Sequence, residues 1–206
     1  MNLAKMLADG AQALGIELSS AQQQQLLDYV GLLNKWNKAY NLTAVREPAE
    51  MVVRHLLDSL SVLPHVQATE IIDVGTGPGI PGIPLAVALP SLQVTLLDSN
   101  GKKTRFARQA ALELGLVNVE VVQARAEQYR NASPQVISRA FASLPDMLDV
   151  AGHLLAPGGR MLAMKAALTD VEMAGVQAPW QAQRIALKVP GLDERRQLII
   201  VTRDVA

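Results

Sequence analysis

Residues 71–82 read IIDVGTGPGIPG, an apolar run followed directly by a loop that holds four glycines. About twenty residues further on, the next apolar run, QVTLLD, ends in Asp98. A buried strand, a glycine-rich loop at its carboxyl end and an acid closing the following strand are typical of a Rossmann-like fold, in which the glycines let the backbone approach a ligand. Asp98 is placed to accept hydrogen bonds from both hydroxyls of an adenosine ribose.

The chain beyond this loop alternates between strand-like and helix-like segments. The predicted parallel strands are IIDVG (71–75), QVTLLD (93–98), VEVVQA (119–124), QVISRA (135–140) and RMLAMK (160–165), with helices near 82–89, 101–114 and 144–155. The last two apolar segments, RIALKVP (184–190) and RQLIIVTRD (196–204), predict an antiparallel hairpin because a turn joins them. We therefore predict an α/β fold with a mostly parallel seven-stranded sheet and an antiparallel last strand. This arrangement is typical of Rossmann-like class I methyltransferases, although a fold alone does not give a function.

The segment before residue 67 has helical periodicity instead. Ser20 and Gln23 have the spacing of a capping box, which marks the start of a helix. Apolar residues then recur at helical spacing: Leu26, Val30 and Leu33. A further helix is predicted to begin near Pro48 and to end at Pro64.

Composition limits the possible chemistry. The chain has 206 residues, half of them hydrophobic, so we expect residues 1–66 to form a helical cap on a ligand-binding domain at 67–206, in one compact unit. It has no cysteine, which excludes disulfides, thiol nucleophiles and zinc–thiolate sites. Its three histidines, His55, His65 and His153, lack the spacing of metal ligands, so we predict no metal. No apolar run reaches the ~18 residues that cross a bilayer, which predicts a cytoplasmic protein without a membrane partner.

Three details of the glycine-rich loop favour S-adenosylmethionine over a dinucleotide. The third glycine of the dinucleotide fingerprint falls at Ile80. Pro78, Pro81 and Pro84 remove N–H donors that a pyrophosphate needs, although Pro81 also suits the start of a helix. Asp73 would repel a pyrophosphate but attract the ammonium of a methionine moiety. A nicotinamide or flavin cofactor, or a purely structural turn, remains as an alternative.

Ala126 and Glu127 follow the third predicted strand, where such folds contact adenine. We predict that they bind adenine through a backbone N–H and a side-chain acceptor. The alternative is a solvent-facing first turn of a helix.

Basic residues gather in two segments of a chain whose formal net charge is zero. The first holds Lys35, Lys38, Arg46 and Arg54, and the second holds Lys102, Lys103, Arg105 and Arg108. Because cations are disfavoured in the first turn of a helix, RNA phosphates are candidate partners for Lys102 and Lys103, with two solvated lysines as the alternative. Trp36 and Tyr40 suit base stacking, but core packing is the favoured interpretation.

The fourth predicted strand ends in Ser138-Arg139-Ala140-Phe141. The Asn/Asp-Pro-Pro-aromatic motif of enzymes that methylate exocyclic amines is missing, and methylation of pyrimidine C5 needs a cysteine. What remains are acceptors such as a ring nitrogen. Guanine N7 fits, since its lone pair needs alignment and no general base. Arg139 is then a candidate positioning residue for the methionine moiety, the base or a phosphate, with a structural ion pair as the alternative.

With these residues assembled, the chain resembles the bacterial small-subunit rRNA methyltransferase G family, also called the glucose-inhibited division protein B family. The segments that carry the resemblance are LLNKWNKAYNLTAVREPAEMVVRHLLDSL, IIDVGTGPGIPGIPLA, LLDSNGKKTRF and VISRAFASL. The resemblance implies methylation of N7 of guanine 527 in 16S rRNA with S-adenosylmethionine as donor. It also implies that Gly75, Ile80, Ala126, Glu127 and Arg139 contact the cofactor. The chain departs from the family at Lys165-Ala166, where a glycine commonly follows the lysine.

The predicted site can now be stated in full. The cofactor-binding residues are Asp73, Gly75, Gly77, Gly79, Ile80, Asp98, Ala126, Glu127 and Arg139. The RNA-binding residues are Lys35, Lys38, Arg46, Arg54, Lys102, Lys103, Arg105 and Lys165. The partner is 16S rRNA or the small ribosomal subunit, and we expect a monomer without an obligate protein partner. An NAD-linked oxidoreductase and a non-catalytic RNA-binding module are the competing hypotheses.

Overall fold

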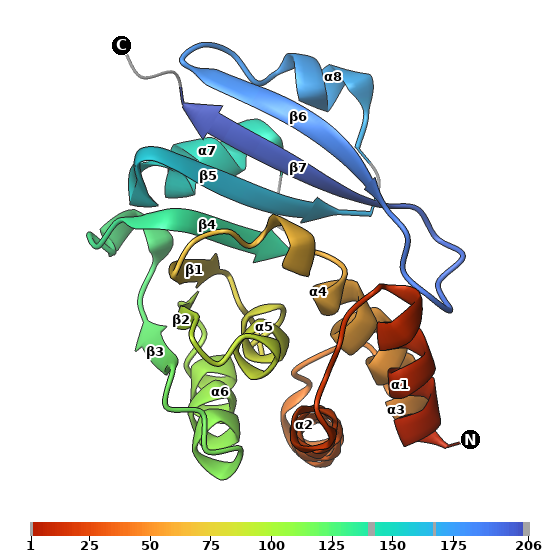
Figure 1. Cartoon of the computed structure of the whole chain (residues 1–206). Helices are drawn as coiled ribbons and strands as arrows, with labels where there is room; N and C mark the ends of the chain where they lie inside the picture. The colour runs from red at the N-terminus through yellow and green to blue at the C-terminus, as the bar shows by residue number, and fades with distance from the viewer. Residues whose placement is uncertain (1, 140–142, 167, 204–206) are drawn as a thin grey trace.

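The computed structural model describes residues 2–139, 143–166 and 168–203, which form one seven-stranded sheet with helices on both faces (Figure 1). The strands are β1 (Glu70–Val74), β2 (Gln93–Asp98), β3 (Val119–Gln123), β4 (Ser133–Arg139), β5 (Leu155–Lys165), β6 (Trp180–Leu187) and β7 (Arg196–Arg203). Strands β1 to β5 are parallel, whereas β7 pairs antiparallel with both β5 and β6. The predicted sheet is confirmed.

The strand order creates a switch point between β1 and β4. The order is β3-β2-β1-β4-β5-β7-β6, so the chain first adds strands on one side of β1 and then crosses to the other side. The helices that follow β1 and β4, α5 (Gly82–Ala88) and α7 (Leu144–Ala151), consequently lie on opposite faces of the sheet. Open α/β sheets bind ligands at this point, beyond the carboxyl ends of the strands.

Helices cover the two faces of the sheet unequally. On one face lie α5 (Gly82–Ala88) and α6 (Gly101–Glu113), together with the helices that precede β1, and on the other lies α7 (Leu144–Ala151) (Figure 1). The predicted helix 144–155 is shorter than expected, because a 3-10 turn at Gly152–Leu154 follows α7. The short helix α8 (Asp170–Ala174) was not predicted.

The helices before β1 are α1 (Leu3–Ala13), α2 (Ser20–Tyr40), α3 (Pro48–Met51), a π-helical segment (Val52–Leu57) and α4 (Asp58–Leu60). The predicted start of α2 is wrong by one residue. Ser19 Oγ accepts from the N–H of Gln22 at 3.2 Å, and Gln22 Oε1 accepts from the N–H of Ser19 at 2.9 Å, so Ser19 and Gln22 form the capping box. Pro64 does not end the next helix, because α4 stops at Leu60 and a separate 3-10 turn contains the proline.

One hydrophobic core joins the N-terminal helices to the sheet. Its fully buried members include residues of α1 and α2 as well as of β1 and β2, among them Leu7, Leu26, Leu33, Ile71 and Leu96. Trp36 packs against this core, with its ring 5.7 Å from that of Phe106 in α6, as favoured from the sequence. The core packing favoured for Tyr40 is wrong, because Tyr40 is 42% exposed.

Polar side chains of α2 reach the elements that carry the glycine-rich loop. Gln22 donates to the carbonyls of Val87 and Ala88 at the end of α5, and Gln25 donates to that of Leu114 at the end of α6. These bonds satisfy carbonyls that a helix end leaves open. On the same face of α2, the hydroxyl of Tyr29 donates to the carbonyl of Pro78, in the loop itself, at 3.0 Å.

Replacing Tyr29 by Phe should lower the free energy of unfolding by about 1 to 2 kcal/mol, because the buried Pro78 carbonyl loses its donor. Urea denaturation measures the change. The matched control is Tyr40→Phe, since the Tyr40 side chain is 42% exposed. Equal stability of the Tyr29→Phe variant and the unsubstituted protein would contradict the role given to this bond.

Candidate active site

The backbone N–H groups of the glycine-rich loop donate hydrogen bonds within the protein. Those of Gly75 and Thr76 donate to the Leu97 carbonyl, that of Gly77 to the Asp98 carboxylate, those of Gly79 and Ile80 to the Thr76 carbonyl, and that of Gly82 to the Asp73 carboxylate. Pro78 and Pro81 have no N–H to offer. The loop therefore has no free backbone N–H group for a phosphate. This supports the argument from the prolines that the ligand is not a pyrophosphate.

Asp73 lies fully buried beneath the loop. Its Oδ2 accepts from Thr76 Oγ1 at 2.6 Å and from the N–H of Gly82 at 2.8 Å. Within the described residues, its Oδ1 has no hydrogen-bond partner. Burial raises the pKa of this carboxyl to about 7, although the two hydrogen bonds act against the shift. A buried carboxylate oxygen without a donor fits a cationic ligand group such as an ammonium.

Asp98 closes β2 and faces a pocket of about 210 Å³. The pocket lies at the carboxyl ends of β1 to β3, and its lining includes Val74, Gly75, Asp98, Ala126 and Glu127. Asp98 Oδ2 accepts from the N–H of Gly77 and Oδ1 from that of Asn100, both at 2.8 Å. Each carboxylate oxygen retains a second lone pair, so the side chain can hold the loop and still accept from two ribose hydroxyls.

Ala126 and Glu127 lie in a 3-10 turn (Ala126–Gln128) across this pocket from Asp98. Among the backbone hydrogen bonds of the described chain, none uses the N–H of either residue. The alternative considered from the sequence was the first turn of a helix, but this 3-10 turn is only three residues long. Its free donors suit the edge of an adenine ring.

Arg139 is the last residue of β4 and contacts the N-terminal helices. Its Nη1 donates to Asp58 Oδ2 at 3.1 Å and to the Arg54 carbonyl at 2.7 Å. The structure thus shows the ion pair considered as the alternative for Arg139, and a contact with the cofactor stays a prediction. Ala140 and Phe141, which complete the motif noted in the sequence, lie outside the described residues.

The ion pair belongs to a network that ties the N-terminal helices to the β6–β7 hairpin. Asp58 is only 3% exposed, and its Oδ1 lies 3.3 Å from Arg196 Nε. Arg54 pairs with Glu194 at 2.8 Å. His55 lies between these groups, with its Nε2 3.0 Å from Thr43 Oγ1.

The pKa of His55 falls to about 4, first because the imidazole is buried and second because Arg139 is positively charged. The unfolded chain takes up this proton near pH 6.5, whereas the folded protein does so only near pH 4. The stability that comes from the neutral imidazole is therefore present above pH 6.5 and is lost as the pH falls towards 4.

Acidification from about pH 7.5 to about pH 5 should cost the protein about 2 kcal/mol through His55. A His55→Gln variant should lose about 2 kcal/mol less than the unsubstituted protein over this interval. Urea denaturation at both pH values measures the difference, with the exposed His153→Gln as control. Identical pH dependence of the His55→Gln variant and the unsubstituted protein would refute the assignment.

The predicted RNA-binding residues divide into two groups. Lys35, Lys38, Arg46, Lys102 and Arg105 are exposed. The contact between Trp36 and Phe106 brings the C-terminal part of α2, which holds Lys35 and Lys38, next to α6, which holds Lys102 and Arg105.

The other members of the predicted set are engaged or partly covered. Arg54 pairs with Glu194, and Lys165 pairs with Glu172 of α8 at 3.0 Å. Lys103 is half-buried. The contacts of these residues with RNA phosphates stay predictions.

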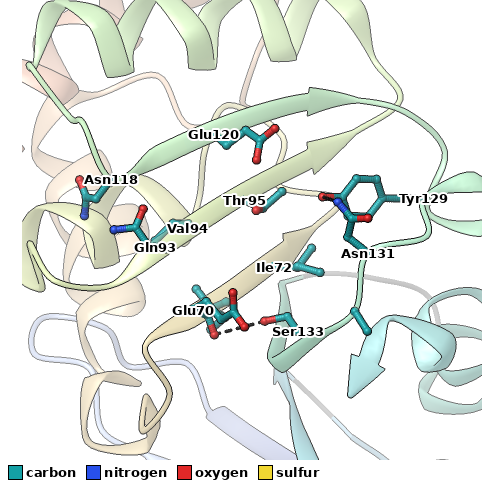
Figure 2. Close-up of a pocket in the computed structure, with 12 residues that line it drawn as sticks. Glu70, Ile72, Gln93, Val94, Thr95, Asn118, Glu120, Tyr129, Asn131 and Ser133 are labelled. Carbon is teal, nitrogen blue, oxygen red and sulfur yellow. Dashed lines mark hydrogen bonds between the residues drawn. The ribbon is translucent and has the colours of Figure 1, made fainter. Parts of the chain in front are cut away.

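A second pocket, of about 230 Å³, lies at the amino ends of the strands, at the end of the sheet away from the candidate active site (Figure 2). Glu70 and Gln93, the first residues of β1 and β2, lie beside each other at its rim. Figure 2 also shows the Ser133 hydroxyl bonded to the Glu70 carbonyl. Because ligands of such sheets bind at the carboxyl ends of the strands, this pocket is separate from the candidate active site.

No group of histidine and acidic side chains in the described ranges is arranged to hold a metal ion. None of the helices in those ranges is long and apolar enough to cross a membrane.

Sequence reasoning missed two residues that shape the site. Tyr29 was not singled out from the sequence, because no local pattern marks its bond to the loop. Asp58 carried a signal, since an acid inside the apolar run LLDSL requires a buried partner.

Solved methyltransferases share the fold. TrmN from Thermus thermophilus superposes with a TM-score of 0.57 at 19% identity, covering 82% of this chain and 53% of that one. The S-adenosylmethionine-dependent methyltransferase SibL superposes with a TM-score of 0.59 at 20% identity, covering 88% and 70%. At these identities the likeness concerns the fold.

Sequence comparison gives the family. Proteins named ribosomal RNA small subunit methyltransferase G are 54% identical in Marinobacter nauticus, over 96% of this chain and 94% of that protein, and 52% identical in Serratia proteamaculans, over 96% and 98%. The family model described as rRNA small subunit methyltransferase G matches residues 22–200. With the glycine-rich loop, the acid at the end of β2 and the seven-stranded sheet in place, the chain belongs to the rRNA small subunit methyltransferase G family.

Proposed function

We propose that this protein methylates N7 of a guanine in 16S rRNA, guanine 527 by family resemblance. The cofactor is S-adenosylmethionine, which supplies the methyl group. The observation that carries the proposal is the glycine-rich loop, whose N–H groups are all engaged within the protein beside a pocket closed by Asp98. A ligand with an adenosine and no phosphate fits this site, which disfavours an NAD-linked oxidoreductase.

Residues of the pocket and of the adjoining loop can be assigned to the ribose, the adenine and the methionine moiety of the cofactor. Asp98 accepts from the ribose hydroxyls, and Ala126 and Glu127 contact the adenine. Gly75, Gly77, Gly79 and Ile80 form the loop over which the methionine moiety passes. Asp73 offers its unpaired Oδ1 to the ammonium from beneath this loop. These assignments make the carboxyl edge of the sheet the cofactor site.

The acceptor needs alignment rather than deprotonation. The lone pair of guanine N7 forms the new N–C bond as the bond from the methyl carbon to sulfur breaks, and the sulfur departs as a neutral thioether. No proton has to be removed, so no general base is required. Arg139, at the switch point between β1 and β4, is the proposed positioning residue. Its bonds to Asp58 and to the Arg54 carbonyl hold the guanidinium at this edge.

The RNA surface of the proposal is the basic region where α2 meets α6. Lys35, Lys38, Lys102 and Arg105 are exposed there, and each contact with a phosphate adds affinity that falls with salt. We further propose a cytoplasmic monomer that acts on 16S rRNA or on the small ribosomal subunit. Its helical cap at 1–66 and its domain at 67–206 act as one unit.

Methyl transfer tests the whole proposal. Labelled S-adenosylmethionine is incubated with small-subunit RNA and with particles from a strain that lacks the enzyme, and the modified nucleoside is identified by mass. We expect one N7-methylguanosine at a single site. Cofactor binding without transfer to either substrate would reject the acceptor and favour a non-catalytic RNA-binding module.

The Asp98→Ala variant should bind S-adenosylmethionine about 1 to 3 kcal/mol more weakly, because the ribose hydroxyls lose a charged acceptor. Isothermal titration calorimetry measures the affinity, and circular dichroism checks the fold. Asp193→Ala removes an exposed acid from the turn between β6 and β7 and should leave the affinity unchanged. An unaltered affinity in a folded Asp98→Ala variant would contradict the ribose assignment.

A further inference from the structure

Because the N–H groups of the glycine-rich loop all donate within the protein, none of them is free to bind the carboxylate of the methionine moiety of S-adenosylmethionine. Backbone N–H groups at the start of a helix commonly bind such an anion. Here the N–H groups of Gly75 to Gly82 donate to carbonyls and carboxylates of the protein, and the prolines have none. Asp73 and Asp98 add negative charge on both sides of the loop. A side-chain cation is therefore needed to neutralise the ligand's carboxylate.

Lys103 is a cation whose side chain lies over this loop. Asn100 caps α6 by accepting from the N–H groups of Lys102 and Lys103, at 3.0 and 3.3 Å. A Cβ placed on Gly77 would lie 4.0 Å from both Cδ and Nζ of Lys103. Lys103 is half-buried, whereas its neighbour Lys102 is exposed. The side chain of Lys103 therefore lies partly covered beside the loop, whereas that of Lys102 is exposed to solvent.

The ammonium of Lys103 is available for a ligand. Among the ion pairs of the described residues, none includes Lys103. The other cation at this edge, Arg139, already donates to Asp58 and to the Arg54 carbonyl. An unpaired ammonium on a half-buried lysine, beside a loop that lacks free donors, is complementary to a carboxylate.

We propose that Lys103 binds the carboxylate of the methionine moiety of S-adenosylmethionine. This role rests on the proposed function and replaces the RNA contact expected for Lys103 from the sequence. Lys102 keeps its expected place on the RNA surface. Of these two adjacent lysines, Lys103 then binds the cofactor and Lys102 binds RNA phosphates.

The test pairs two variants with two ligands in isothermal titration calorimetry. The variants are Lys103→Met and Lys102→Met, and the ligands are S-adenosylmethionine and its decarboxylated form, which lacks only the carboxylate. Lys103→Met should weaken the binding of S-adenosylmethionine about tenfold or more and leave the binding of the decarboxylated form unchanged. Lys102→Met should change neither affinity. Lys103→Arg, which keeps the charge, should retain most of the affinity.

Three results would overturn the role of Lys103. They are an equal loss of both ligands in Lys103→Met, an unchanged affinity for S-adenosylmethionine in the folded variant, and a loss of RNA affinity with intact cofactor binding. Failure of the unsubstituted protein to bind S-adenosylmethionine would instead reject the proposed function. Thermal melting without ligand establishes that each variant is folded.

Discussion

Two carboxylates hold the glycine-rich loop, and the rest of the site depends on them. Asp73 binds the loop from beneath through Thr76 and Gly82, and Asp98 binds it from the side through Gly77. A Cβ on Gly82 would crowd both Asp73 and Leu96, so the loop can approach the sheet this closely only with glycine at that position. These bonds use the N–H groups of Gly77 and Gly82, and the remaining N–H groups of the loop donate to the carbonyls of Leu97 and Thr76. The hydrogen bonds that fix the shape of the loop therefore also remove the donors that a phosphate would require.

The N-terminal helices take part in this support. Helix α2 binds the ends of α5 and α6 and the Pro78 carbonyl, while Asp58 and Arg54 engage Arg139 at the neighbouring strand. Burial raises the pKa of Tyr29 far above its ordinary value, which keeps its hydroxyl a donor to the loop. The N-terminal helices are therefore part of the framework of the candidate active site.

Local sequence patterns were sufficient for the sheet and for the loop. Buried parallel strands such as IIDV carry an unbroken apolar run, and the hairpin at the end carries a turn, so both could be predicted. Helix boundaries were less certain, because Ser19 and Ser20 are equivalent in composition and only the backbone decides which one caps α2. The partners of Arg139 and Tyr29 come from positions far apart in the chain, and no local pattern specifies them. The placement of Lys103 against Gly77 likewise required the fold.

The ion pair between Asp58 and Arg196 joins the beginning of the chain to its end. Leu198 of β7 also belongs to the core that contains Leu7 and Leu26. During synthesis, the N-terminal helices emerge first and wait for about 140 further residues before this counter-charge and this side chain exist. The packing of the N-terminal helices is therefore completed only after β7 has been synthesised and has emerged from the ribosome.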